Sequence, residues 1–135
     1  MSKILEIFID GACQPNPGKG GIGIFIKSSD FQEKYSFTLK DEVTNNIAEY
    51  EALIKCLNFI KSKFMKFNEI VIYTDSKLVC MQFNKFWKCK DLKLQQLLNN
   101  AHLIYSELNV NIKLKHIPRE LNTEADALAK SAINN

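Results

Sequence analysis

The sequence has 135 residues, of which 46% are hydrophobic and 24% charged, a composition typical of a globular domain with a hydrophobic core. Its apolar runs are too short for a membrane span, no secretory signal precedes the first strand-like run, and the net charge of +3 is too small to indicate a nucleic-acid partner by itself. We therefore expect one domain over residues 1–135, monomeric and cytoplasmic. The four cysteines form no C-x-x-C pair, which predicts reduced thiols.

Three successive segments in the N-terminal third of the chain have the pattern of strands. Residues 3–10 (KILEIFID) alternate apolar and polar residues and predict a central strand that ends at Asp10. Residues 20–28 and 33–40 predict two further strands joined by a polar turn. Three strands in such short order favour an antiparallel meander.

After the meander, the apolar period changes to that of a helix. From Asn46 onward apolar residues recur three or four positions apart, and Asn46 with Glu49 resembles a capping box. The order βββαβααβα predicts a mixed α/β fold, with a five-stranded mixed sheet flanked by helices. The later elements are expected as a strand over 69–74, helices over 76–84 and 92–107, a strand over 110–117, and a helix over 122–133 capped by Asn122 or Thr123.

A glycine-rich stretch after Asp10 has the spacing of a dinucleotide-binding loop. Gly18, Gly20 and Gly23 match G-x-G-x-x-G, but β-branched and aromatic residues follow, as in a strand and unlike the start of a helix. The phosphate-binding motif G-x-x-x-x-G-K-[ST] fails as well, because Lys19 is followed by glycine. The stretch is therefore predicted as a hairpin, and no organic cofactor is expected.

Four acidic residues hold informative positions in the predicted elements. Asp10 and Asp75 end the first and fourth strands, Glu49 lies in the first turn of its helix, and Asp126 lies among alanines in the last helix. Any one of them alone is more often a turn former or cap, but four that converge repel one another unless a cation neutralises them. Oxygen ligands suit Mg²⁺ or Mn²⁺, and two such ions about 3.5–4 Å apart hold an in-line phosphoryl displacement.

Four stretches of the chain resemble the signature motifs of a known family. The four are FIDGACQPNPGKGGIG, TNNIAEYEAL, YTDSKLVCMQF and HIPRELNTEADALAK, and they are similar, in the same order, to the signature blocks of type I ribonuclease H. The resemblance covers nearly the whole chain, from Lys3 to Lys130. The resemblance implies an endonuclease that hydrolyses the RNA strand of RNA–DNA hybrids with Mg²⁺ or Mn²⁺, leaving 5′-phosphate and 3′-hydroxyl ends. The ending H-I-P-R-E-x-N-x-x-A-D resembles the plant-like and archaeal branch.

The resemblance also implies roles for individual residues. By it, the metal-binding and catalytic set of the family matches Asp10, Glu49, Asp75 and Asp126. Thr44 matches a position that helps hold a phosphate of the DNA strand. A further group matches positions along the minor groove of the hybrid, where the 2′-hydroxyl distinguishes RNA from DNA: Gly11, Cys13, Asn16, Asn45 and Asn46. The alternative for the two adjacent asparagines is a role as helix caps.

Two residues near the C-terminal block are candidates for assisting catalysis. His116 lies ten residues before Asp126, as the catalytic-loop histidine of the family does, and such a histidine helps to move protons or release product. Here His116 ends a predicted strand, so packing or capping is the alternative. Arg119 is a candidate for placing positive charge near the phosphate, and its alternative is a salt bridge with Glu120 or Glu124.

The basic stretch over residues 83–93 (FNKFWKCKDLK) matches the place of a longer basic protrusion in many family members. Lys85, Trp87 and Lys88 interleave charge and aromatic surface, as in a channel for a DNA strand. The alternatives are a solvated lysine face and a tryptophan packed in the core. The shortening predicts weaker affinity for the hybrid or reliance on another mode of binding.

Two further hypotheses stay open beside the hybrid-specific nuclease. One is a module that binds hybrids without cleaving them, and the presence of all four carboxylates speaks against it. The other is a related nuclease that also acts on double-stranded RNA or on DNA.

Overall fold

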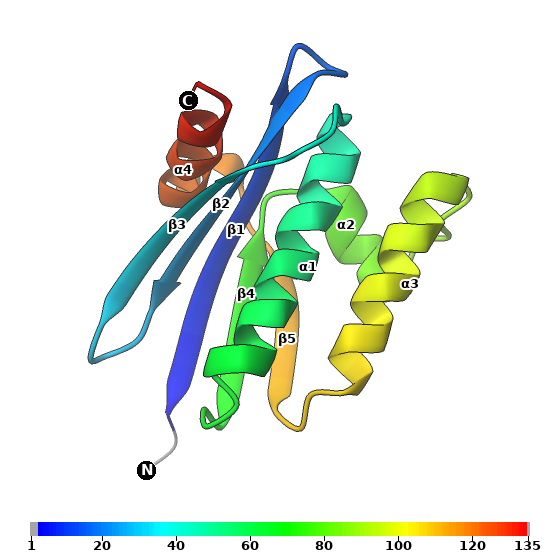
Figure 1. Ribbon diagram of the computed structural model, residues 1–135. Coiled ribbons are helices and arrows are strands. Elements are labelled where there is room, and N and C mark those ends of the chain that lie inside the picture. The colour runs from blue at the N-terminus through cyan, green and yellow to red at the C-terminus, as the bar shows by residue number, and fades with distance from the viewer. Residues whose placement is uncertain (1–2, 135) are drawn as a thin grey trace.

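A computed structural model describes residues 3–134 and shows a five-stranded sheet with the strand order β3-β2-β1-β4-β5 (Figure 1). The first three strands pair antiparallel, and β4 and β5 extend the sheet in parallel with β1. The strands are β1 (Ile4–Gln14), β2 (Lys19–Lys27), β3 (Gln32–Thr38), β4 (Glu69–Thr74) and β5 (Asn111–His116). The predicted mixed sheet and the predicted order of elements are confirmed.

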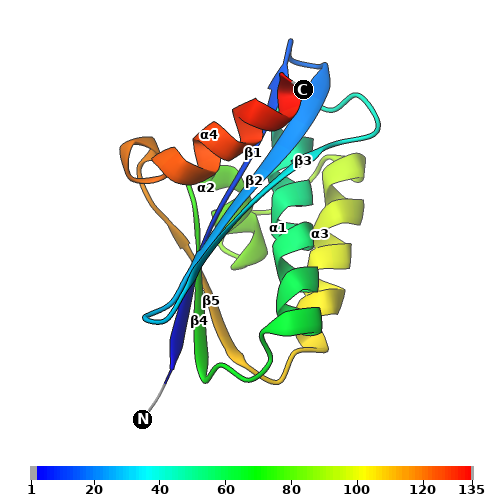
Figure 2. The same ribbon diagram turned by 60° about the vertical axis from the view of Figure 1, so that its left-hand side comes forward.

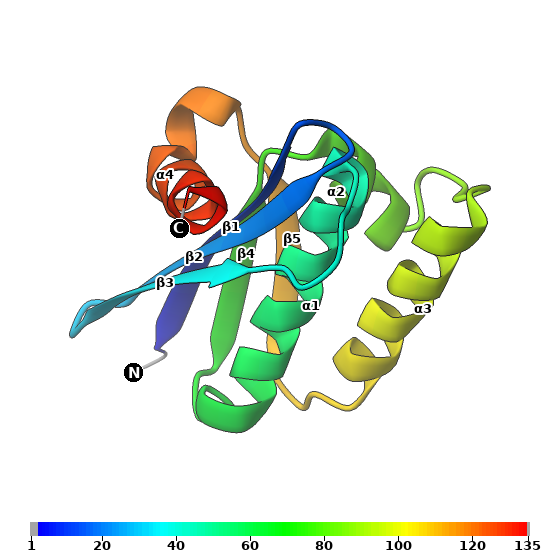
Figure 3. The same cartoon turned by 45° about the horizontal axis from the view of Figure 1, so that its top comes forward.

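Helices cover both faces of the sheet, as Figures 2 and 3 show from two sides. Three of them lie on one face, and α4 lies alone on the other, against β1, β2 and β3. A short 3₁₀ turn, which the sequence patterns did not predict, comes before α4. The helices are α1 (Asn45–Lys63), α2 (Lys77–Phe83), α3 (Leu92–Ser106), the turn η1 (Arg119–Leu121) and α4 (Thr123–Ile133).

The main core lies between α1 and the sheet. In β1, Leu5, Ile7 and Ile9 are fully buried and alternate with less buried residues. Since successive side chains of a strand point to opposite faces, Asp10 belongs to the other face, on which α4 packs. Asp10 pairs in register with Gly23 of β2, which also lies beneath α4.

Two glycines allow helices to approach the sheet closely. A Cβ atom on Gly23 would overlap the carbonyl oxygen of Ala125 in α4, and one on Gly11 would overlap the backbone of Ala48 in α1. Both helices therefore lie against bare backbone at these points. Of the three glycines that resemble a cofactor loop in the sequence, Gly20 and Gly23 are residues of β2, and Gly18 forms an isolated bridge with Val43 just before it.

The N-termini of the helices differ from the prediction in two places. Thr44, and not Asn46, caps α1, its side chain accepting from the backbone amide of Ile47 at 3.2 Å. The predicted capping box is wrong because the Glu49 carboxylate is bonded to the sheet. Asn122 occupies the N-cap position of α4, but its side chain makes no capping bond.

No helix between residues 3 and 134 is both long and apolar enough to cross a bilayer. All four cysteines fall within this range, and none of them is in a disulfide.

Candidate active site

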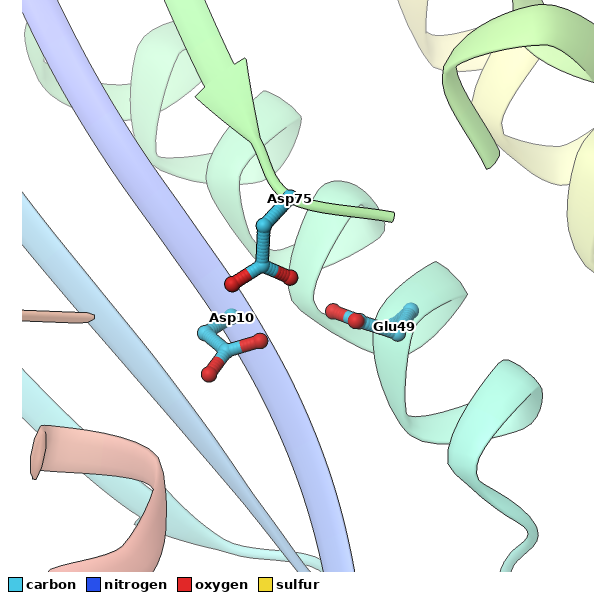
Figure 4. Close-up of side chains that lie close together, drawn as sticks. All are labelled: Asp10, Glu49 and Asp75. Atoms are coloured by element: carbon cyan, nitrogen blue, oxygen red, sulfur yellow. The ribbon is translucent and has the colours of Figure 1, made fainter. Parts of the chain in front are cut away.

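Asp10 and Asp75 lie side by side because β1 and β4 are parallel neighbours. Their ladder ends at the pair Ile9↔Thr74, so the two aspartates are the next residues in register. Figure 4 shows their carboxylates facing one another, with the carboxylate of Glu49 approaching from α1. Within the part of the chain that the structure describes, Asp10, Glu49 and Asp75 form a group in which one carboxylate oxygen from each residue lies within 4.8 Å of the other two.

Glu49 reaches this group through the backbone of β1. The amide of Gly11 donates to Oε1 of Glu49 at 2.8 Å and to Oδ1 of Asp10 at 3.1 Å. This shared donor requires α1 to lie directly on β1, which the absence of a side chain at Gly11 permits. The local cause of the cluster is thus a glycine beside the strand aspartate.

Burial and mutual repulsion make the cluster unfavourable as a set of free anions. Burial raises the pKa of Asp10 to about 7, with further increases from the negative charges of Asp75 and Asp126. Burial also raises the pKa of Glu49 well above its usual range, and the charges of Asp10 and Asp75 add to this effect. At neutral pH the cluster therefore favours binding of either a proton or a cation.

Asp126 approaches the cluster from α4, on the opposite face from Glu49. Its charge acts on Asp10, but it does not belong to the group within 4.8 Å of one another. One of its oxygens pairs with Nζ of Lys130, one helical turn later, at 3.1 Å. The structure therefore brings three of the four predicted carboxylates together and places the fourth beside Asp10.

Asn122 is a residue of the site that the sequence patterns did not indicate as functional. Its side chain, only 1% exposed, donates from Nδ2 to the carbonyl of Ile9 at 2.9 Å and to Oδ2 of Asp75 at 3.3 Å. An asparagine just before a helix predicts a cap, and nothing in the sequence around it distinguishes this other use.

Most of the predicted minor-groove residues form one exposed ledge next to the cluster. The thiol of Cys13 contacts Oδ1 of Asn45 at 3.2 Å and Oδ1 of Asn16 at 3.5 Å, and Oδ1 of Asn16 also accepts from the amide of Asn45 at 3.2 Å. Thr44 and Asn46 flank the ledge and are exposed. The ledge therefore joins the β1–β2 turn to the start of α1.

His116 and Arg119 are both exposed at the same end of the sheet. His116 is the last residue of β5 and pairs in register with Thr74, directly before Asp75. Arg119 begins the turn η1, and its carbonyl accepts from the amide of Asn122. Across residues 3–134, no salt bridge joins Arg119 to Glu120 or Glu124, and the latter pairs with Lys34 at 3.2 Å.

The basic segment between α2 and α3, residues 84–91, is held in place by hydrogen bonds to its backbone, while most of its side chains are exposed. Gln82 accepts from the buried hydroxyl of Tyr50 at 2.6 Å and donates to the carbonyl of Lys88 at 3.2 Å. Trp87 is 43% exposed, which rules out the core packing considered from the sequence, and Nζ of Lys77 lies 5.8 Å from its ring centroid. Lys85 and Lys88 are exposed on the same segment.

Solved structures define the class to which this fold belongs. A type 1 enzyme, the RNase H1 of the archaeon Halobacterium salinarum, superposes with a TM-score of 0.87 and is 31% identical, covering 97% of this chain and 98% of that one. LC11-RNase H1, solved in complex with an RNA/DNA hybrid, gives a TM-score of 0.88 at 34% identity, with 96% of each chain covered. The fold is that of the RNase H1 structures.

The sequence comparisons agree with this class. The family model described as RNase H matches residues 2–134, and the chain belongs to this family. A ribonuclease H from Ruthia magnifica is 42% identical over 98 residues, a match that covers 69% of this chain and 62% of that protein. The match thus spans less than two thirds of this curated relative. The resemblance to type I ribonuclease H that the sequence motifs suggested is confirmed.

Proposed function

We propose that this protein is a metal-dependent endoribonuclease that hydrolyses the RNA strand of RNA–DNA hybrids and leaves 5′-phosphate and 3′-hydroxyl ends. The observation that carries the proposal is the group formed by Asp10, Glu49 and Asp75, in which one carboxylate oxygen from each residue lies within 4.8 Å of the other two, in a chain of the RNase H family. The relative solved with an RNA/DNA hybrid supports the choice of substrate.

The chemistry of the donor set fits a hard divalent cation. All the donors are carboxylate oxygens, and burial together with the neighbouring negative charges raises the pKa values of Asp10 and Glu49. Mg²⁺ and Mn²⁺ favour such oxygen ligands. The residues that would hold two ions are Asp10, Glu49, Asp75 and Asp126. When bound, the ions would activate water and stabilise charge on the leaving oxygen.

The ledge would position the RNA strand. Cys13, half-buried two residues after Gly11, contacts the exposed side chains of Asn16 and Asn45. The amide of Gly11 contacts two of the carboxylates. Asparagine amides can both donate to and accept from a 2′-hydroxyl, which is the group that separates ribose from deoxyribose. In this arrangement Asn46 continues the ledge and Thr44 holds a phosphate of the DNA strand.

The basic segment would hold the DNA strand. Lys85, Trp87 and Lys88 present positive charge and an aromatic face to solvent, the combination on which single strands stack and track. At the sheet end, His116 would move a proton or assist product release, and Arg119 would place positive charge near the phosphate. Both are exposed and therefore accessible to a polymer substrate.

One assay tests the proposal against its competitors. The protein is incubated with an RNA–DNA hybrid, double-stranded RNA and duplex DNA in Mg²⁺, Mn²⁺ or EDTA, and the ends of the products are mapped. We expect cleavage of the hybrid in either metal, none in EDTA, and none by an Asp75→Asn variant. Hybrid binding without cleavage would instead support a non-catalytic module, and cleavage of double-stranded RNA would widen the substrate class.

A further inference from the structure

The side chain of Asn122 is buried at the junction of three elements that carry carboxylates of the site. It bonds to the carbonyl of Ile9, the residue before Asp10 in β1, and to the carboxylate of Asp75 at the end of β4. The backbone carbonyl of Asn122 accepts from the backbone amide of Asp126 at 3.1 Å, in the first turn of α4. Asn122 thus contacts Asp75, Asp126 and the residue directly before Asp10.

The orientation of the amide is dictated by its partners. A backbone carbonyl and a carboxylate are both acceptors, so only the NH₂ end of the amide can face them. Both of its protons are then used, one toward β1 and one toward Asp75. The ladder between β1 and β4 ends at Ile9↔Thr74, so the amide bridges the two strands just where their own pairing stops.

The other end of the same amide argues against a role in packing alone. Oδ1 of Asn122 is buried and has no hydrogen-bond partner among residues 3–134. A buried, unpaired acceptor destabilises a fold, and an apolar side chain of similar size would avoid it. The favourable hydrogen bonds of this side chain are therefore those that its NH₂ group donates, and one of them goes to Asp75.

We propose that Asn122 is a positioning residue for cation binding. By fixing one oxygen of Asp75 and the backbone next to Asp10, it leaves the other carboxylate oxygens directed at the ion, as hydrogen-bond partners of metal ligands do in other sites. This inference rests on the proposed metal site. It assigns to Asn122 a contribution to metal affinity, apart from any contact with the substrate.

Calorimetric titration with Mn²⁺, together with the rise in melting temperature on adding Mn²⁺, tests this role. For Asn122→Ala we expect Mn²⁺ affinity to fall by about 10- to 100-fold, with a correspondingly smaller rise in melting temperature. Thr38→Val is the matched control, because it removes another side-chain bond between the sheet and α4, from Thr38 Oγ1 to the carbonyl of Ala132 at 2.8 Å, without touching the cluster. Its Mn²⁺ affinity should equal that of the wild type.

The outcomes separate this inference from the proposed function. A folded Asn122→Ala variant with wild-type Mn²⁺ affinity would overturn the role of Asn122 and leave the metal site intact. A wild-type protein that binds no Mn²⁺ would overturn both. If Asn122→Ala does not fold, the side-chain NH₂ resonances of Asn122 in the wild type decide. They should shift on adding Mg²⁺ with the same midpoint as the amide of Asp75, and unshifted resonances at saturation would overturn the inference.

Discussion

The backbone amide of Gly11 donates to the carboxylates of both Glu49 and Asp10, at 2.8 and 3.1 Å. A single N–H therefore sets the spacing between a helix carboxylate and a strand carboxylate. It also makes the geometry of the acidic cluster depend on how closely α1 lies on β1.

Replacing Gly11 tests this dependence. In Gly11→Ala the new methyl group would overlap the backbone of Ala48, so α1 must move away from β1. We expect the free energy of unfolding to fall by about 1–3 kcal/mol and activity on the hybrid to fall about 100-fold through misplacement of Glu49. Urea denaturation and initial rates measure the two effects. Gln14→Ala, at the exposed end of the same strand, should change stability little.

Removing the charge of Asp10 should stabilise the metal-free protein at high pH. Burial raises the pKa of Asp10 from 3.8 to about 7, so its contribution to stability is greatest below about pH 4 and is lost as the pH rises through 7. The asparagine of Asp10→Asn stays uncharged at every pH, so this variant keeps its stability as the pH rises. It should be more stable than the wild type by about 2–4 kcal/mol at pH 8 in EDTA, yet inactive. Urea denaturation at pH 5 and 8 measures it. An equal difference at the two pH values would contradict the explanation.

Divalent ions should stabilise the wild type more at pH 8 than at pH 6. Protons and the ion compete for the same buried carboxylates, since the pKa values of Asp10 and Glu49 are both raised. Melting curves with and without millimolar Mg²⁺ measure this effect. Asp75→Asn should show little increase at either pH, and a wild-type increase in that variant would mean that the ion binds elsewhere.

The lysines of the basic segment should govern the salt dependence of hybrid binding. In the triple variant Lys85→Ala/Lys88→Ala/Lys90→Ala, we expect weaker binding and a plot of log affinity against log salt that is less steep by about one per lysine that contacts a phosphate. Gel-shift titrations across salt concentrations provide the slope. The matched control replaces Lys61, Lys63 and Lys66, exposed near the far end of α1, and an equal effect there would show that only total charge matters.

Trp87 should matter for binding and little for folding. Because it is 43% exposed, Trp87→Ala should change the free energy of unfolding by less than about 1 kcal/mol, while hybrid affinity falls by about 1–3 kcal/mol through the loss of a stacking surface. Denaturation and gel shifts separate the two effects. Leu92→Ala, 76% exposed at the start of α3, is the control for loss of exposed apolar area and should leave affinity unchanged.

The sequence was sufficient to predict the sheet and the convergence of the strand-end aspartates. Alternation predicted β1, residues 69–74 were predicted as a strand that again ends in an aspartate, and the parallel arrangement of the two strands brings Asp10 next to Asp75. The pattern was insufficient where a short polar residue has several possible partners. Asn46 and Asn122 both suggest caps locally, but Thr44 caps α1, and the amide of Asn122 finds β1 and Asp75, over 40 residues away in the chain. Contacts of that separation leave no local periodicity to detect.

Gly23 sets the distance between α4 and the sheet, because it has only a hydrogen atom where every other residue has a Cβ atom. At Gly23 the carbonyl of Ala125 occupies the space of the missing Cβ, and Asp126 is the next residue along the helix. Any side chain at position 23 would raise α4 as a rigid body and withdraw the fourth carboxylate from Asp10, although Gly23 itself has no group that binds metal or substrate. Gly23 in β2 thus controls how closely the side chain of Asp126 approaches Asp10.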